Sequence, residues 1–233
     1  MSTTTAAPTM APTAASTRWI QLLLGLICMM SISSPQYVWA LFTKPLGTTL
    51  GASAPRLQVT FSILIVLQTF FSPFQGWLVE RFGPRWLIAA GCALTGLSWM
   101  LAAHATSLWG LYATYGLLGG LGTGIVYIGV VDQMVRWFPD RRGFAAGMVA
   151  AGYGMGAIAT TFPISDSLAA SGYQSTLTTF GLIFGVVGVM AALGLKSPPD
   201  LPLPTHLAVS ERNTATGDMV RNPIFWLMFV RWP

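Results

Sequence analysis

The sequence predicts an all-α polytopic membrane protein, and its composition, its charge distribution and the length of its apolar runs support that class. Of its 233 residues, 53% are hydrophobic and 8% are charged, and the mean hydropathy is +0.62. Soluble domains carry about 25% charged residues, so this composition suits lipid rather than water. An open sheet cannot satisfy its backbone groups in hydrocarbon, and the alternating ten-residue segments of a membrane barrel are not seen. Helices are therefore expected.

The membrane-spanning helices are predicted from five runs without any Asp, Glu, Lys or Arg. These runs cover residues 19–43, 57–79, 86–131, 143–165 and 167–195. A spanning helix needs about 20 mainly apolar residues, so the third run is long enough for two helices, with a turn at the polar cluster around His104. The six predicted spans, which together form a unit over residues 18–196, are 19–43, 57–79, 86–104, 108–135, 141–164 and 175–195.

The segments outside these spans are expected to be a tail, a linker and the start of another helix. Residues 1–17 are rich in Ser, Thr, Ala and Pro, which is typical of a disordered tail, and the first span lacks the cleavage site of a signal peptide. Residues 197–221 are polar and contain prolines, as linkers do. Residues 222–233 resemble a seventh helix cut short, because Arg231 and Pro233 arrive about ten residues into it.

The basic residues predict a cytoplasmic N-terminus. In that orientation only Lys44 and Arg56 lie on the outer side, and the reverse orientation would violate the positive-inside rule. The tail and the 197–221 linker are then cytoplasmic. Nine basic residues fall on the cytoplasmic side: Arg18, Arg81, Arg85, Arg136, Arg141, Arg142, Lys196, Arg212 and Arg221.

The loop between the second and third spans carries a charged glycine motif, G-W-L-V-E-R-F-G-P-R at residues 76–85. Its first glycine lets two helices approach, and its second permits a sharp turn. The acid and the arginines are expected to form a salt-bridged latch at the membrane surface. The pattern resembles the G-x-L-x-D-R-x-G-R signature of the major facilitator superfamily, although an ordinary basic loop is the alternative. The motif residues are Gly76, Glu80, Arg81, Gly83 and Arg85.

Other segments resemble the oxalate:formate antiporter family over most of the chain. They are Q-Y-x-W at 36–39, G-x-G-I-V-Y at 122–127, R-W-F-P-D at 136–140, A-A-G-Y-G at 150–154 and N-P-x-F-W at 222–226. The resemblance implies a six-helix N-terminal bundle of the major facilitator fold, truncated at the start of helix seven. It also implies secondary transport, by alternating access, of a small organic anion such as oxalate, formate or another carboxylate.

The same resemblance implies a substrate cavity lined by Gln36, Tyr37, Gln58, Tyr127 and Tyr153. A Gln or Tyr in hydrocarbon must find hydrogen-bond partners, so it tends to face the interior of a bundle. A tyrosine hydroxyl can donate to a carboxylate while its ring holds a planar ligand. The alternative is that Tyr127 and Tyr153 only bridge helices. Gln58 opens the second span near the outer surface and is also a candidate for an outer gate.

At the inner side, we expect Asp132 to pair with Arg136, one helical turn away, in an inner gate. A proton-coupling carboxylate is the alternative role for Asp132. Glu80 is expected to pair with an arginine of the 136–142 segment, which includes Arg136 and Arg141. His104 is expected to be a solvated residue at the outer end of its span.

Small residues in the spans are assigned to packing. Cys28 and Cys92 lie inside apolar runs without metal-ligand spacing, so they are expected to be small apolar fillers. Glycines that repeat every four residues allow helices to approach closely, whereas a dinucleotide-binding loop would need a preceding strand. The repeats are Gly116, Gly120 and Gly124, then Gly152 and Gly156.

Several functional classes are excluded. The spans carry no nucleophile–base pair and no metal-ligand cluster, so neither an enzyme nor a metal or cofactor is expected. The scattered basic residues do not form the patch of a nucleic-acid binder. An anion in a membrane cavity needs cationic partners, and in the antiporter family a C-terminal six-helix half supplies them. We therefore expect a multi-pass protein of a cell membrane, the bacterial inner membrane by resemblance. The alternative is a non-transporting remnant or scaffold half.

Overall fold

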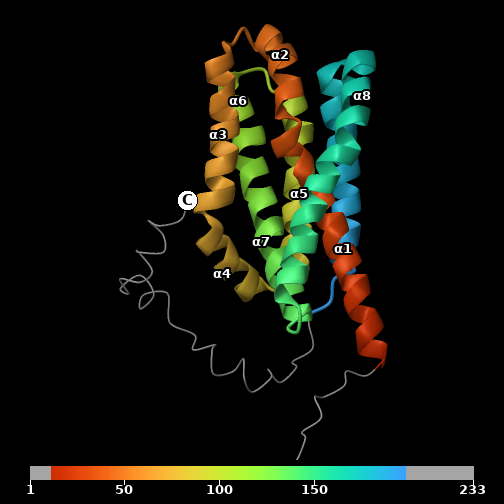
Figure 1. Cartoon of the computed structure of the whole chain (residues 1–233). Coiled ribbons are helices and arrows are strands. Elements are labelled where there is room, and N and C mark those ends of the chain that lie inside the picture. Colours follow the sequence, from red (N-terminus) through yellow and green to blue (C-terminus); the bar gives the residue numbers. More distant parts are fainter. Residues whose placement is uncertain (1–11, 198–233) are drawn as a thin grey trace, which may run out of the picture. The chain divides into compact units, whose positions relative to one another are not determined.

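The computed structural model describes residues 12–197, apart from the side chains of residues 12–15 and Glu80, and within that range it contains helices and no strands. The all-α prediction is confirmed. Figure 1 shows the long helices running side by side, with their connections at the two ends of the bundle. The elements are α1 Pro12–Tyr37, α2 Trp39–Leu50, α3 Ala54–Phe70, α4 Ser72–Phe82, α5 Pro84–Ala103, α6 Leu108–Leu111, η1 Tyr112–Leu118, α7 Gly119–Trp137 and α8 Arg142–Leu193.

The helices are long enough for several membrane crossings. Four helices are long and apolar enough to cross a membrane, namely Ser16–Tyr37, α5, the continuous stretch Leu108–Trp137, and α8; the bent pair α3–α4 makes a fifth. At 1.5 Å per residue, the 52 residues of α8 would extend about 78 Å, more than twice the ~30 Å hydrocarbon core. The segment is interrupted at Gly172 and folds back on itself as two crossings (Figure 1).

The first helix begins earlier than predicted. It starts at Pro12, so residues 12–17 are helical, although we expected them in the disordered tail. Proline is well tolerated in the first helical turn, because its missing N–H has no partner there in any case. The alanines at 14 and 15 are the strongest helix formers.

The first span is also not continuous to residue 43. It is interrupted at Val38, and α2 then carries the chain on to Leu50. The loop expected over 44–56 is thereby reduced to residues 51–53. Pro35 removes one backbone donor just before the interruption and thereby weakens the helix there.

The second span is bent rather than straight. Its two parts, α3 and α4, differ in direction by 55°, and they meet at Phe71. Pro73 lies in the first turn of α4, where a proline fits the start of a new helix better than the interior of an old one.

Glycines with positive φ mark two of the turns. Gly83 has φ 83° between α4 and α5, which confirms the sharp turn expected in the 76–85 motif. Gly172 has φ 77° and is non-helical, whereas the residues around it, predicted as a loop over 166–174, are helical. A residue with a side chain would be strained at these φ values, whereas glycine, which has no Cβ, adopts them without strain and allows the chain to reverse.

The core has two parts, one at each end of the bundle, and α8 packs against both α1 and α5. Cys28 and Cys92 are free thiols within the first part, as the filler role predicts. The glycine repeats bring helices into contact. A Cβ at Gly120 would lie 2.8 Å from the carbonyl oxygen of Leu64, and one at Gly156 would lie 2.6 Å from the Cα of Met30.

Candidate functional site

Tyr153 lies at the centre of a cluster of polar and aromatic side chains. It comes from α8, and its side chain is only 6% exposed. Its hydroxyl donates to Oε1 of Gln36 at 2.8 Å and accepts from Nε2 of Gln68 at 3.4 Å. The cluster therefore joins the end of α1, the end of α3 and the first half of α8. The buried Tyr153 hydroxyl therefore has hydrogen-bond partners within the cluster, as a polar group in a membrane interior requires.

Two further tyrosines flank this hydroxyl. The ring of Tyr37 lies 5.6 Å from the ring of Tyr153, and the ring of Tyr127 lies 5.5 Å from it on another side, nearly perpendicular at 87°. Both distances are in the range of favourable aromatic contacts. Gln36, Tyr37, Tyr127 and Tyr153 are thus brought together, as the resemblance implies for them.

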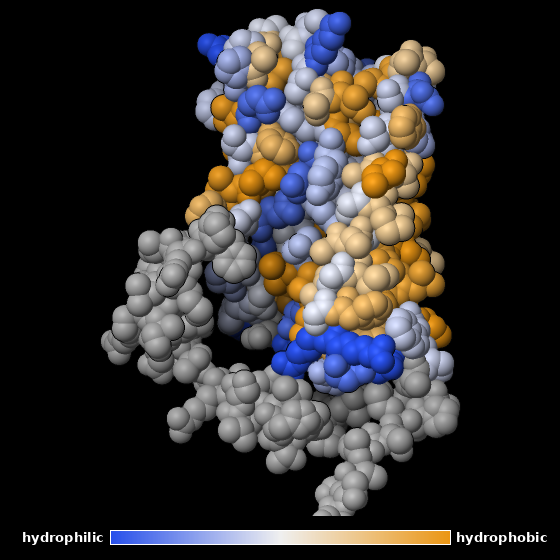
Figure 2. Space-filling view, in the orientation of Figure 1, coloured by the Kyte–Doolittle hydropathy of each residue, from blue (hydrophilic) through white to orange (hydrophobic). Residues whose placement is uncertain are grey.

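Three donors of this cluster have no protein partner within residues 12–197: the hydroxyls of Tyr37 and Tyr127 and the amide nitrogen of Gln36. Tyr37 is 52% exposed, and Gln36 and Tyr127 are half-buried, so none of the three residues is fully enclosed by the described part of the chain. Figure 2 shows a pale and blue band running down the bundle between orange flanks, on the face bounded by α3 and α8. A polar path in an otherwise apolar bundle is typical of a solute pathway.

The cluster lies near mid-depth of the bundle. Tyr153 is eleven residues from the start of α8, and Tyr127 is ten residues from the end of α7. At 1.5 Å per residue both lie about 15 Å from the α7–α8 turn. That is half of the roughly 30 Å hydrocarbon thickness, where facilitator-type transporters bind their substrates.

Gln58 is placed with a different group. It is exposed near the start of α3, and its Oε1 accepts a hydrogen bond from the indole nitrogen of Trp39 at 3.3 Å. The Trp39 ring lies 4.7 Å from the Tyr115 ring at a tilt of 50°, so Gln58 belongs to the aromatic group around α2 and η1. This placement fits the outer-gate role better than substrate contact.

Gln68 was missed in the sequence. It is a polar amide inside the charge-free run 57–79, and the reasoning that singled out Gln58 applies equally to it. Its Oε1 is buried and has no hydrogen-bond partner in the described part of the chain. The bend after α3 ends the helix two residues beyond Gln68, which places its amide beside Tyr153.

The basic end of the bundle is the end that carries the α4–α5 turn, the α7–α8 turn and Lys196. Asp132 pairs there with Arg136 at 3.0 Å, the pairing expected one helical turn apart. Arg81 and Arg85 lie over tryptophan rings, 5.2 Å from Trp77 and 5.6 Å from Trp86. The side chain of Glu80 lies outside the described residues, so its pairing with an arginine stays a prediction.

The expected role of Gly76 in close helix approach is wrong. A Cβ at Gly76 would meet only Ile128, at an ordinary 3.9 Å. Gly76 instead borders a cavity of about 100 Å³ together with Val79, Ile128 and Asp132. The close contact between α4 and α7 occurs at Gly124, where a Cβ would lie 2.6 Å from Oε1 of Gln75.

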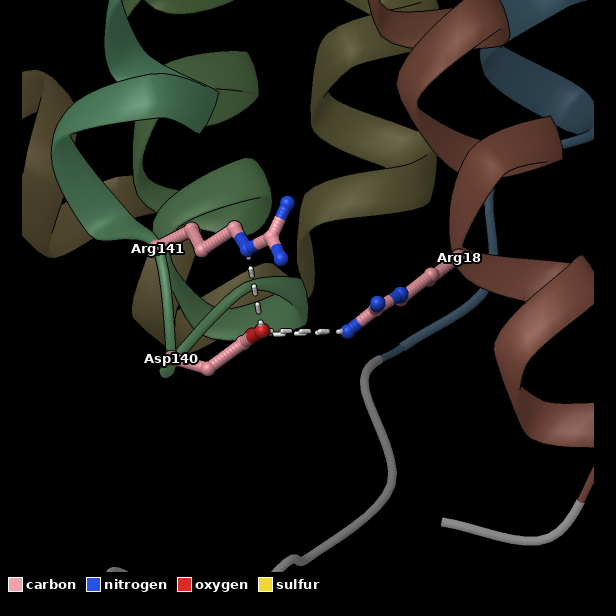
Figure 3. Close-up of polar contacts among 3 residues, drawn as sticks. All are labelled: Arg18, Asp140 and Arg141. Carbon is pink, nitrogen blue, oxygen red and sulfur yellow. Dashed lines mark hydrogen bonds and ion pairs between the residues drawn. The ribbon is translucent and has the colours of Figure 1, made fainter.

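A second ionic group at the basic end was not foreseen. Nη1 of Arg18, at the start of the first span, lies 3.4 Å from Oδ1 of Asp140 in the α7–α8 turn, and Nε of Arg141 approaches the same carboxylate at 3.7 Å (Figure 3). The Arg18 guanidinium also lies 5.2 Å from the ring of Phe138. Arg141 is thus paired within its own turn, and Asp140 ties α1 to the segment between α7 and α8.

Apolar helices long enough to span a membrane, packed around a half-buried polar cluster, are typical of a multi-pass membrane protein of the transporter class. Comparison with known families agrees with this class. The chain belongs to the Major Facilitator Superfamily, whose family model matches residues 9–232. It is accordingly related to membrane transporters and not to enzymes.

Several characterised and uncharacterised transporters are similar to the chain. The oxalate:formate antiporter of Oxalobacter formigenes is 34% identical over 91% of this chain and 50% of its own length. The uncharacterized MFS-type transporter YhjX of Escherichia coli is 29% identical over 92% and 53%. Monocarboxylate transporter 13 of Bos taurus is 38% identical over 46% and 25%. The chain spans about half the length of the first two.

Proposed function

We propose that this chain forms the N-terminal half of a secondary active transporter for a small organic anion such as oxalate, formate or another carboxylate. The observation that carries the proposal is a set of three donors around Tyr153 that have no partner among the described residues, namely the hydroxyls of Tyr37 and Tyr127 and the amide of Gln36. The relatives named for oxalate, formate and monocarboxylate support the same substrate class.

The chemistry of these groups suits a carboxylate. A carboxylate has only acceptor sites, and each hydrogen bond to a charged partner contributes about 1.5–3 kcal/mol. The rings of Tyr37 and Tyr127 add apolar faces on either side of a small planar ion. Because the Tyr153 hydroxyl already donates to Gln36, it holds the amide with its nitrogen available for the ligand.

This cluster contains no positively charged group to pair with the negative charge of the substrate. The charge-free runs contain no Lys or Arg, and an anion out of water requires cationic partners. We propose that a C-terminal six-helix half supplies them, since facilitators bind substrate between two halves. Movement of the two halves about the site then exposes it to one side of the membrane at a time.

Uptake into proteoliposomes tests the proposal. We expect the chain joined to a C-terminal half to exchange external labelled oxalate for internal formate, and the 233-residue chain alone to transport neither. We call this chain joined to a C-terminal half the two-half protein. If the two-half protein folds but takes up no carboxylate, the alternative hypothesis of a non-transporting scaffold half is supported instead.

A further inference from the structure

The first span is broken directly beside the cluster. The helical path of α1 ends at Tyr37, Val38 adopts φ −97° and ψ 3°, and α2 starts at Trp39. Gln36 and Tyr37 are the last two residues before the break, and they carry two of the three donors that lack a partner within residues 12–197. Their direction depends on how this turn is held.

Tyr115, which lies in the segment η1, Tyr112–Leu118, contacts the broken turn. Its hydroxyl donates to the carbonyl oxygen of Pro35 at 2.8 Å, and its side chain is only 1% exposed. In a continuous helix the N–H of Trp39 would donate to this carbonyl, but Trp39 here begins a new helix. A buried carbonyl without a donor is costly, and the Tyr115 hydroxyl supplies the donor.

The surroundings of Tyr115 also fix the start of α2. The Tyr115 ring lies 4.7 Å from the ring of Trp39 and 6.2 Å from the ring of Trp99, and the Trp39 indole nitrogen donates to Gln58. Tyr115 itself is part of the π-helical segment η1, Tyr112–Leu118. Such widened turns are rare and are frequently found at functional sites.

We propose that Tyr115 is a positioning residue, whose hydroxyl holds the break in the first span and thereby directs Gln36 and Tyr37 toward the substrate. The role in directing substrate-binding groups rests on the proposed function, whereas the role in holding the break does not. Gln58 and Trp39 then hold the other side of the same break.

The substitution Tyr115→Phe removes the hydroxyl and keeps the ring. Tyr112→Phe is its matched control, because Tyr112 lies in the same π-helical segment and its hydroxyl also donates to a backbone carbonyl, that of Arg56 at 2.7 Å. The control therefore loses the same kind of bond without touching the break.

Hydrogen exchange of the ligand-free 233-residue chain in detergent is the measurement. We expect amides in residues 36–41 to exchange about fivefold faster or more in Tyr115→Phe, with α5 unchanged and with no such change in Tyr112→Phe. Equal exchange at 36–41 in the two variants would overturn the proposal, and so would an increase spread over all helices.

A second measurement separates this proposal from the proposed function. In the two-half protein, Tyr115→Phe should raise the KM for oxalate several-fold and leave kcat near that of Tyr112→Phe, because the binding groups are misdirected but the halves still move. If exchange changes as expected while no carboxylate is bound or transported by either variant, the positioning role stands and the proposed function fails. An unchanged KM in an active transporter would contradict the positioning role.

Discussion

At the scale of single residues, the hydroxyl of Tyr153 connects the parts of the cluster. Tyr153→Phe leaves Oε1 of Gln36 without its donor and Nε2 of Gln68 without its acceptor. One such hydrogen bond contributes about 0.5–1.5 kcal/mol, so we expect the KM for oxalate uptake by the two-half protein to rise about two- to tenfold. Tyr127→Phe, which removes a donor that we propose binds the ligand directly, should weaken uptake by a similar or larger factor. Unchanged uptake in both variants, with Tyr112→Phe as control, would leave these tyrosines as packing residues.

Candidate site residues could be predicted from the sequence where they lie in a segment that resembles a known family. Gln36, Tyr37, Tyr127 and Tyr153 belong to segments that resemble a known family, and the structure brings all four together. Gln68 and Tyr115 belong to none of these segments. Their contacts depend on where the bend in α3–α4 and the π-helical turn place them. The spacing of residues in the sequence does not predict such irregularities.

At the scale of elements, close glycine contacts hold α8 against α1, and a pair of glycines on α8 allows a matched test. At Gly156 a Cβ would lie 2.6 Å from both the Cα and the carbonyl oxygen of Met30, whereas at Gly154 it would meet nothing within 4 Å. We expect Gly156→Ala to destabilise the bundle by about 1–3 kcal/mol through overpacking. Gly154→Ala should be neutral or stabilising by up to ~1 kcal/mol, since alanine is the better helix former. Unfolding midpoints in detergent measure both, and equal midpoints would contradict the packing described here.

The existence of the helices followed from the sequence, but their interruptions did not. Five charge-free runs, one of them long enough for two helices, predict six crossings, because lipid sets the length that each crossing needs. The break at Val38, the 55° bend at Phe71 and the single-residue reversal at Gly172 lie inside or beside apolar segments. Prolines at 35 and 73 accompany the first two, yet prolines are also tolerated in straight membrane helices, so they did not locate the breaks.

At the scale of the whole molecule, the basic residues predict which end faces the cytoplasm. Arg18 and Asp140 meet at the basic end, and the Gln133 amide and Trp137 indole both donate there to the Lys196 carbonyl. Single cysteines placed at Arg85 and Thr49 test the orientation, because the natural thiols are 0–1% exposed and should not react. In intact cells, an impermeant thiol reagent should label Thr49→Cys and leave Arg85→Cys unlabelled. Labelling of Arg85→Cys from outside would contradict the predicted cytoplasmic position of this loop.

The central claim is that a small carboxylate binds among Tyr37, Tyr127 and Tyr153, and substrate protection of Tyr37→Cys tests it most directly. Thr49→Cys, exposed on α2 and away from the cluster, is the control. The measurement is the rate of thiol labelling in the two-half protein, with and without oxalate at a concentration well above its KM. If oxalate binds there, it should slow labelling at position 37 several-fold and leave position 49 unchanged, whereas chloride at equal ionic strength should protect neither. A protein that transports oxalate but is labelled at position 37 at the same rate with and without it would contradict the claim.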